Sequence, residues 1–160
     1  MGKEIIQRYF EELVETISQI PVKKVERVVE IIYQGYFRTN QVFTLGNGGS
    51  ASTASHFCCD LGKGAVVDGN PRLRVISLND NMALLTAYAN DLGYDSVFVE
   101  QMKNLIQEGD VVICITASGN SPNVVRAVEF ANKQGAITVG ILGFGGGKVR
   151  DMVKEHVTLE

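Results

Sequence analysis

From residue 41 onward, short apolar runs alternate with amphipathic stretches, and this alternation limits the folds that are open to the chain. The runs cover residues 41–45, 73–78, 111–116, 137–142 and 156–159. The run Val-Val-Ile-Cys-Ile at 111–115 lacks polar positions, a pattern typical of parallel strands that are buried on both faces. We therefore expect an α/β protein whose five-stranded parallel sheet lies between two layers of helices, a three-layer α-β-α sandwich.

Helical periodicity fills the stretches between the predicted strands. The expected helices cover residues 51–61, 82–90, 95–107, 122–134 and 147–153. Residues 1–40 predict two further helices, and Pro21 stands where a proline can open the second of them. We expect one domain over residues 1–160, with an N-terminal helical pair at 1–40 and a parallel α/β core at 41–160.

Both N-terminal helices are apolar on more than one side. Ile5, Val14, Val28 and Ile31 widen the apolar stripes of the two helices. Helices of this kind usually contact more than one partner surface. Two interpretations stay open, which are oligomerisation through these helices and simple burial within the chain.

Composition excludes several classes of partner. The chain has 160 residues, a net charge of −3 and a pI near 5.4, so no basic surface for nucleic acid or anionic membrane is expected. No apolar stretch approaches the roughly 18 residues that would span a bilayer. The three cysteines, Cys58, Cys59 and Cys114, are an odd number without zinc-finger spacing, which favours a reducing, cytoplasmic location.

The first predicted strand leads directly into a glycine-rich loop and then a helix. Gly46, Gly48 and Gly49 would let the backbone approach a ligand, and Ser50 is predicted to cap the helix. Such a helix N-terminus favours an anion. The alternatives are an ordinary tight turn and a dinucleotide fingerprint paired with Asp68, which lies in a loop rather than after a second strand.

The third predicted strand ends in a second polar loop. Thr116, Ser118 and Ser121 surround Gly119, and a proline follows at the helix start. Hydroxyl and backbone donors together suit a phosphate monoester, which offers only acceptors. The alternative is a serine-rich helix cap without a ligand. A further glycine cluster at 143–147 fails the P-loop spacing and is predicted to be a flexible turn.

Two groups of polar residues are candidates for acid–base or sugar contacts. His56 and Asp60 stand four residues apart on a predicted helix and therefore share a face, as an acid–base pair, as two metal ligands or as an ordinary surface pair. Asn90 and Asp91 end another predicted helix and could hold sugar hydroxyls, although polar residues are common at that position.

Several of these segments resemble one family. GNGGSASTASHF, NDLGYDSVF, EGDVVICITASGNSPNVVRAV and the later GGGK are similar to the sugar isomerase (SIS) domain family, and within it to the phosphoheptose isomerases. The resemblance covers nearly the whole chain. It implies a flavodoxin-like sheet, a homotetramer with sites between subunits, and interconversion of sedoheptulose 7-phosphate and D-glycero-D-manno-heptose 7-phosphate through an enediol.

The resemblance also implies roles for individual residues. Asp60 corresponds to the acid–base catalyst, and His56 with Asp60 to ligands of zinc, the one candidate cofactor; no nucleotide cofactor is expected. The residues expected to contact the phosphorylated sugar are Asn47, Gly48, Gly49, Ser50, Asn90, Asp91, Thr116, Ala117, Ser118 and Ser121.

Three departures from the family pattern bear on the substrate. Asp60 stands where the family normally has glutamate, Ala117 replaces a hydroxyl residue, and Lys63 is the nearest cation where an arginine is expected. The shorter carboxylate favours the alternative function, a non-catalytic SIS regulator that binds phosphosugar or serves as a protein-binding scaffold.

The predicted fold ends on a strand without a helix to cover it. Members of this type continue with a helix that carries a glutamine and the histidine that partners the catalytic carboxylate. Two interpretations stay open: either the chain is incomplete at its C-terminus, or this version has lost half of the catalytic apparatus. We expect the first, because an uncovered parallel sheet would expose apolar surface.

Overall fold

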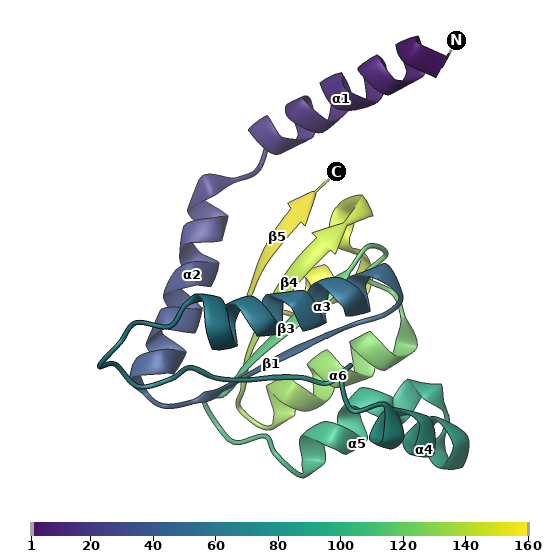
Figure 1. The fold of residues 1–160 in the computed structure, drawn as a ribbon. Coiled ribbons are helices and arrows are strands. Elements are labelled where there is room, and N and C mark those ends of the chain that lie inside the picture. Colours follow the sequence, from purple (N-terminus) through teal and green to yellow (C-terminus); the bar gives the residue numbers. More distant parts are fainter. Residues whose placement is uncertain (1, 160) are drawn as a thin grey trace.

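A five-stranded, all-parallel sheet lies at the centre of the computed structural model, which describes residues 2–159 (Figure 1). The strands are ordered β2-β1-β3-β4-β5 across the sheet. Their bounds are β1 Gln41–Gly46, β2 Arg74–Ser77, β3 Val111–Thr116, β4 Ile137–Gly143 and β5 Glu155–Leu159. The expected fold class is thus confirmed, and each predicted strand is found within three residues of its expected ends.

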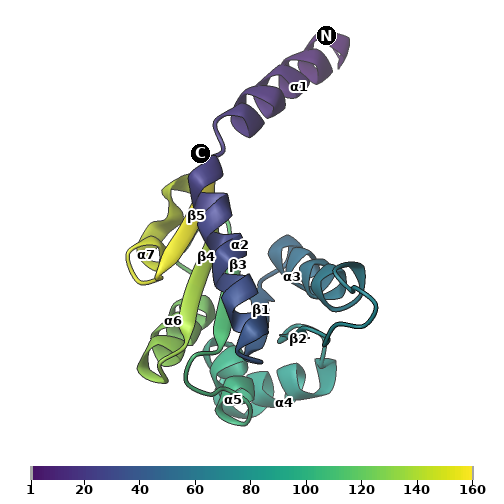
Figure 2. The same cartoon turned by 90° about the vertical axis from the view of Figure 1, so that its left-hand side faces the viewer.

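Helices cover both faces of this sheet (Figure 2). The α-helices are α1 Gly2–Ser18, α2 Val22–Phe37, α3 Gly49–Cys59, α4 Met82–Leu92, α5 Val97–Lys103, α6 Pro122–Lys133 and α7 Gly147–Arg150. Three short helical turns join them, η1 Asp60–Gly64, η2 Tyr94–Ser96 and η3 Phe144–Gly146.

Alternate strand residues supply two separate apolar cores. Phe43 and Leu45 of β1 face one side, where residues of α5 and α6 such as Phe98 and Val128 pack against them. Val42, one position away, faces the other side with residues of α2 and α3. Since successive side chains of a strand point to opposite faces, an uninterrupted apolar run is needed to fill both cores.

The first helix stands apart from the rest of the molecule. Figures 1 and 2 both show α1 projecting beyond the sheet, and α1 has no buried residue. Ile5 is 56% exposed and Val14 68% exposed, whereas Val28 of α2 is buried and Ile31 is packed against the second core. Burial within the chain therefore accounts for part of α2 but for none of the described residues of α1.

Two predicted helices are too long. Residues 95–107 were expected as one helix, but η2 and α5 occupy 94–103, and the chain then turns towards β3 where the Asp110 carboxylate accepts the N–H of Gln107. The helix expected at 147–153 ends at Arg150. In both cases the apolar residues that prolong the helical pattern, Ile106 and Val153, pack against the core from turns.

None of the helices within residues 2–159 combines the length and the apolar character needed to cross a membrane.

All three cysteines are free: Cys114 is buried, Cys58 is half-buried and Cys59 is exposed.

Candidate active site

The candidate residues of the two polar loops meet at one edge of the sheet. Strand order reverses between β1 and β3, because the chain crosses from β1 to β2 on one side and then returns to β3 on the other. Gly46 at the end of β1 pairs with Ile115 near the end of β3, so the loops that follow are neighbours. In open α/β sheets, ligands bind at the carboxyl ends of the strands at such a reversal point.

The first loop, residues 46–50, is held tightly at its base. A Cβ on Gly46 would lie 2.7 Å from the backbone oxygen of Ser50, so only glycine fits there. The side chain of Asn79, which follows β2, pairs with the Gly46 backbone in both directions: it accepts from the N–H at 3.1 Å and donates to the carbonyl at 2.9 Å.

Ser50 does not cap α3, and this prediction is wrong. Gly48, with φ +56, is the residue before the helix, and α3 begins at Gly49. Ser50 lies inside the first turn, where its N–H donates to the carbonyl of Asn47. A backbone with positive φ suits glycine and replaces the side-chain cap that the sequence suggested.

The second loop, residues 116–121, uses some of its hydroxyl groups to fix its own shape. Thr116 is nearly buried, and its hydroxyl oxygen accepts the N–H of Gly119 at 3.2 Å. The Ser118 hydroxyl oxygen accepts the N–H of Asn120 at 3.3 Å. Ser121 precedes α6 without making a side-chain cap bond. Each hydroxyl that accepts such a bond keeps its own hydrogen to donate to a ligand. Ala117 is exposed and adds only backbone groups to this loop.

The glycine cluster at 143–147 packs against the second loop. A Cβ on Gly119 would overlap the carbonyl oxygen of Gly146, and one on Gly147 would overlap the carbonyl of Ser118. The N–H of Lys148 donates to the side chain of Asn120 at 3.1 Å. The turn predicted here is therefore a support for the second loop.

An amide pair joins the first loop to the first turn of α6, the helix that follows the second loop. The side chains of Asn47 and Asn123 exchange two hydrogen bonds of 2.9 Å each, although 76 residues separate them in the sequence. Tyr94 adds a bond from its hydroxyl to Asn47 Oδ1 at 3.0 Å. Asn90 and Asp91, at the end of α4, are exposed and bonded to each other at 2.8 Å. Because Tyr94 follows closely after Asp91, its bond holds this end of α4 near the first loop.

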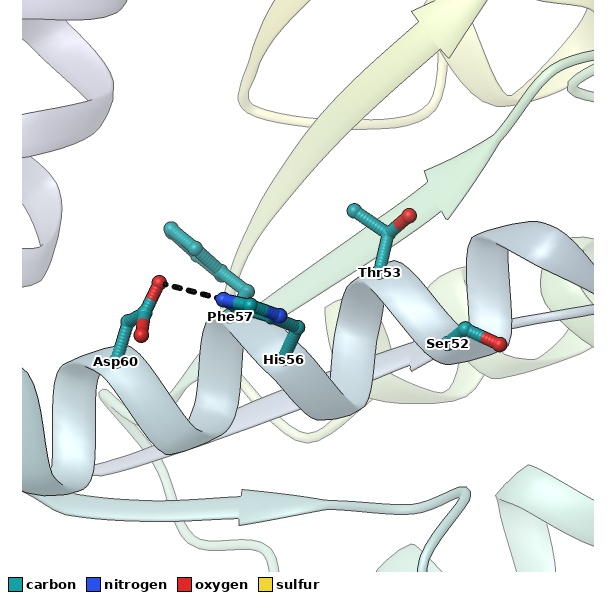
Figure 3. Close-up of a pocket in the computed structure, with 5 residues that line it drawn as sticks. All are labelled: Ser52, Thr53, His56, Phe57 and Asp60. Carbon is teal, nitrogen blue, oxygen red and sulfur yellow. Dashed lines mark ion pairs between the residues drawn. The ribbon is translucent and has the colours of Figure 1, made fainter.

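His56 and Asp60 form the predicted pair on the outer face of α3. His56 Nε2 lies 3.2 Å from Asp60 Oδ2, and the two side chains are 77% and 65% exposed. Figure 3 shows them pointing towards each other along the helix, beside Thr53 and Phe57. They line a shallow depression of about 460 Å³ together with Ser52, Thr53 and Phe57. Asp60 also begins η1, a π-helical turn of a kind frequent at functional sites.

The depression on α3 is separate from the two loops. All five of its lining residues belong to the stretch 52–60, and none comes from either loop. Asp60 is ten residues beyond Ser50, a distance of about 15 Å along a helix. A single chain therefore brings Asn47 to Asn123 and Tyr94 but does not bring Asp60 to them.

The residues of one chain do not fit a zinc ion at this pair. Catalytic zinc sites normally have three protein ligands and structural sites four. His56 and Asp60 supply two, and within residues 2–159 no cluster of three or more His, Cys, Asp or Glu side chains is positioned to hold a metal.

The second histidine lies away from these loops. His156, in β5, has Nδ1 2.9 Å from the Thr158 hydroxyl, and burial lowers the pKa of its imidazole, as do Lys24 and Arg150. A larger hollow of about 740 Å³ lies between α2 and the start of β5, lined by residues such as Arg27, Lys154 and Glu155 and by none of the predicted site residues.

Sequence reasoning missed three residues of the site, Asn79, Asn123 and Tyr94. Asn123 could have been noticed as a polar residue directly after Ser-Pro at a helix start. Its partner could not, because an amide pair across 76 residues leaves no local pattern. Asn79 and Tyr94 likewise act on the first loop from distant segments.

Comparison with known proteins places these features in a wider context. The family described as SIS domain matches residues 7–143. A phosphoheptose isomerase of Geobacter metallireducens is 34% identical, with 99% of this chain aligned to 85% of that protein. One from Alteromonas mediterranea is 35% identical, over 96% of this chain and 78% of its own length.

Solved structures agree with the sequence relatives. The structure of a phosphoheptose isomerase from Neisseria gonorrhoeae superposes with a TM-score of 0.88 at 30% identity, covering 99% of this chain and 84% of that one. A phosphoheptose isomerase from Francisella tularensis gives a TM-score of 0.90 at 26% identity, covering 100% and 86%.

Proposed function

The chain belongs to the SIS domain family, and from this premise we propose that it is a phosphoheptose isomerase. The reaction is the interconversion of sedoheptulose 7-phosphate and D-glycero-D-manno-heptose 7-phosphate, an aldose–ketose isomerisation. The observation that carries the proposal is the meeting of the two polar loops at the reversal point of the sheet, where the Asn47–Asn123 pair links the first loop to the helix that follows the second. A phosphorylated sugar would find hydroxyl donors at one end of this site, in the second loop, and amide and backbone donors at the other end, in the first loop.

The second loop would bind the phosphate. The hydroxyls of Thr116, Ser118 and Ser121, with the backbone N–H groups around Ala117, offer donors to a group that has only acceptors. Ala117 has no hydroxyl, so this loop offers one donor fewer than the family pattern.

The first loop and the end of α4 would hold the sugar. Asn47, Gly48, Gly49 and Ser50 offer amide, backbone and hydroxyl donors, and Asn90 with Asp91 adds groups that can bind sugar hydroxyls.

Asp60 is the proposed acid–base group. A carboxylate can remove the proton from C1 or C2 of the sugar and return it to the neighbouring carbon, which passes through an enediol. The charge that develops on the carbonyl oxygen needs hydrogen-bond donors in place before the reaction. Because Asp60 is one methylene shorter than the usual glutamate, its reach to the carbon is the step most sensitive to placement.

We also propose that the enzyme is a homo-oligomer, a tetramer, with sites at subunit interfaces. The separation of Asp60 from the two loops within one chain supports this arrangement, since a second copy could bring an Asp60 to the loops of the first. The unburied apolar residues of α1, such as Tyr9, Phe10 and Leu13, offer a surface for such contacts.

The direct test is an isomerase assay of the purified chain with sedoheptulose 7-phosphate. Turnover that falls sharply in Ser118→Ala supports the proposal. Absence of turnover, together with retained phosphosugar binding that Ser118→Ala abolishes, would instead support the non-catalytic SIS regulator that the short Asp60 side chain favours.

Mixing two inactive variants tests the shared site. Asp60→Asn lacks the acid–base group and Ser118→Ala lacks a phosphate donor, so neither should turn over substrate alone. If Asp60 acts on the loops of a neighbouring subunit, refolding the two variants together restores part of the activity in hybrid oligomers. Activity that stays at the level of the separate variants contradicts sites between subunits.

We further propose that the enzyme binds zinc and is located in the cytoplasm. His56 and Asp60 would be two zinc ligands, so any further ligand has to come from outside this pair, and no step above depends on the metal. Metal analysis of the purified protein and of His56→Ala checks this point. The odd number of cysteines, all three free, supports a reducing compartment.

A further inference from the structure

We infer that Asn123 and Tyr94 are positioning residues that restrict Asn47 to a single free hydrogen-bond donor aimed at the substrate. The inference rests on the proposed function, because it concerns what the first loop offers to the sugar. It goes beyond that function in two ways. It assigns roles to Asn123 and Tyr94, which lie outside both loops, and it states that the Asn47 side chain can only donate a hydrogen bond to the substrate.

The hydrogen bonds around Asn47 have a defined direction. The N–H of Val124 donates to Asn123 Oδ1 at 3.0 Å, which identifies that atom as the acceptor end of the Asn123 amide. Asn123 Oδ1 therefore also accepts from Asn47 Nδ2, and Asn123 Nδ2 donates to Asn47 Oδ1, each at 2.9 Å. With the Asn47 amide oriented in this way, the Tyr94 hydroxyl has to donate to Asn47 Oδ1, at 3.0 Å.

Counting donors and acceptors shows what Asn47 has left. A side-chain amide has two lone pairs on oxygen and two hydrogens on nitrogen. Asn123 and Tyr94 take both lone pairs of Asn47 Oδ1, and Asn123 takes one hydrogen of Nδ2. Among the described residues 2–159, the second hydrogen of Nδ2 has no acceptor. Asn47 can therefore donate one bond to a ligand but cannot accept one.

Burial of Asn123 helps to keep the Asn47 side-chain amide in this orientation. Asn123 is 2% exposed, so water does not compete for its bonds to Asn47. A buried amide that lost its partner would leave unsatisfied polar groups, which is unfavourable. Tyr94 is 50% exposed and belongs to η2, so it approaches Asn47 from a different element. Two elements thus hold the Asn47 amide from two directions.

A single fixed donor suits one chemical partner, an oxygen that gains negative charge. In the enediol step the carbonyl oxygen of the sugar becomes more negative, and a pre-oriented N–H stabilises it more than the ground-state substrate. An amide free to rotate would offer its oxygen as readily as its nitrogen. Holding Asn47 by Asn123 and Tyr94 removes that alternative before substrate binds.

The kinetic experiment is a double-mutant cycle with Tyr94→Phe and Asn47→Ala. Tyr94→Phe keeps the ring and removes only the hydroxyl, and we expect kcat to fall about tenfold with little change in KM, since the donor matters most in the transition state. In the Asn47→Ala background, Tyr94→Phe should have no further effect on kcat, because Tyr94 acts through Asn47. Effects that multiply in the double variant would overturn the inference. Tyr33→Phe on α2 is the matched control and should leave kcat unchanged.

A measurement that does not need activity separates this inference from the proposed function. In the ¹⁵N-labelled protein, the side-chain NH₂ signals of the buried Asn123 should exchange slowly with water, and those of Asn47 and Asn123 should shift in Tyr94→Phe but not in Tyr33→Phe. Rapid exchange, or no shift, overturns the inference even if the wild type is an active isomerase. Slow, Tyr94-dependent signals in a protein without turnover would leave the hydrogen bonds established and reject only the isomerase.

The role of the buried Asn123 is tested by comparing two substitutions at this position. Asn123→Ala removes both bonds to Asn47 and should lower kcat more than Tyr94→Phe does. Asn123→Gln keeps the amide and should recover part of the loss if the amide pairing matters. Equal losses in the two variants, at equal thermal stability, would contradict a role for the amide.

Discussion

Gly119 and Gly146 meet backbone to backbone, so that a Cβ on Gly119 would occupy the position of the Gly146 carbonyl oxygen. Gly119 belongs to the second polar loop, and Gly146 belongs to the glycine cluster at 143–147, 27 residues further along the chain. The contact makes the two segments one structural unit. The shape of the proposed phosphate site therefore depends on a segment outside the second loop.

Gly119→Ala should destabilise the fold far more than a substitution that only strains the backbone. Gly119 has φ +61 and no room for a Cβ, whereas Gly69 has φ +85 with open space around it. We expect Gly69→Ala to cost about 1 kcal/mol of unfolding free energy and Gly119→Ala about 3 kcal/mol or more. Urea denaturation measures both, and equal losses would show that the close contact with Gly146 is unimportant.

Asp60→Asn should abolish most of the isomerase activity, with a fall in kcat of about 100-fold or more, because the amide cannot take up a proton. The side chain is 65% exposed in one chain, so folding should be unaffected. Circular dichroism checks the fold and the sedoheptulose 7-phosphate assay checks turnover. Asp68→Asn, in the loop before β2, is the matched control. An active Asp60→Asn would exclude Asp60 as the acid–base group.

Stability should fall at acid pH partly through Glu155. The Lys24 ammonium, 2.6 Å from Glu155 Oε1, lowers the pKa of this 7% exposed carboxyl below its ordinary 4.5, against the opposing effect of burial. A lowered folded-state pKa means that the stabilisation is complete above pH 4.5 and is lost as the pH falls through the folded value.

Glu155→Gln should therefore be less stable than the wild type by about 1 kcal/mol at pH 7, since Lys24 is partly exposed. The difference should shrink below pH 4.5 as the wild-type carboxyl becomes protonated. Thermal unfolding as a function of pH measures this, with Glu26→Gln on α2 as control. A difference independent of pH would show that the ion pair is not its cause.

Charge placed on the apolar face of α1 should dissociate the proposed oligomer. Phe10 is 59% exposed and Ile6 56% exposed in one chain, so Phe10→Asp or Ile6→Asp should leave the α/β core folded. Light scattering should then report a smaller particle than for the wild type. Glu11→Lys, a change of charge on the same helix, controls for charge alone. An unchanged mass in all three would place the contacts elsewhere.

The cysteines should differ in their reaction with thiol reagents. Burial raises the pKa of the Cys114 thiol to about 12, so it has almost no thiolate at neutral pH. Cys59 is exposed and should react first. Mass spectrometry after mild alkylation should find Cys114 modified only when the protein is unfolded. Labelling of Cys114 in the native protein would show that the core around β3 opens readily.

The sheet could be predicted from the sequence because its central strands are buried on both faces and therefore need continuous apolar runs. Residues 111–116 were expected as a strand and form β3 with the same ends, since an apolar run buried on both sides has few other solutions. Helix ends were less certain. Ile106 continues a helical pattern, yet it lies beyond the end of α5 and still packs against the core, because the preference of an apolar residue for the core does not depend on helical structure.

The candidate site was only partly predictable. Local patterns predicted the two loops, because glycines and hydroxyls that lie between a strand end and a helix N-terminus favour anion binding, although Thr116 and Ser118 also use their hydroxyls to fix the loop. The prediction that Ser50 caps the helix was wrong. Gly48, with its positive φ, precedes α3, and the helix begins there without a side-chain cap. Asn79, Tyr94 and Asn123 could not be assigned, because their roles depend on contacts between distant segments that only the folded chain creates.

The proposed oligomer has a consequence for the folding of α1, which finds no packing partner in its own chain. A helix of 17 residues with no buried side chain gains little from its own chain, and a peptide of that length is only marginally helical in water. If a second copy supplies its packing, mass action links the order of α1 to the protein concentration. Dilution should then unwind the first helix before the sheet is affected, and activity per molecule should decline with it.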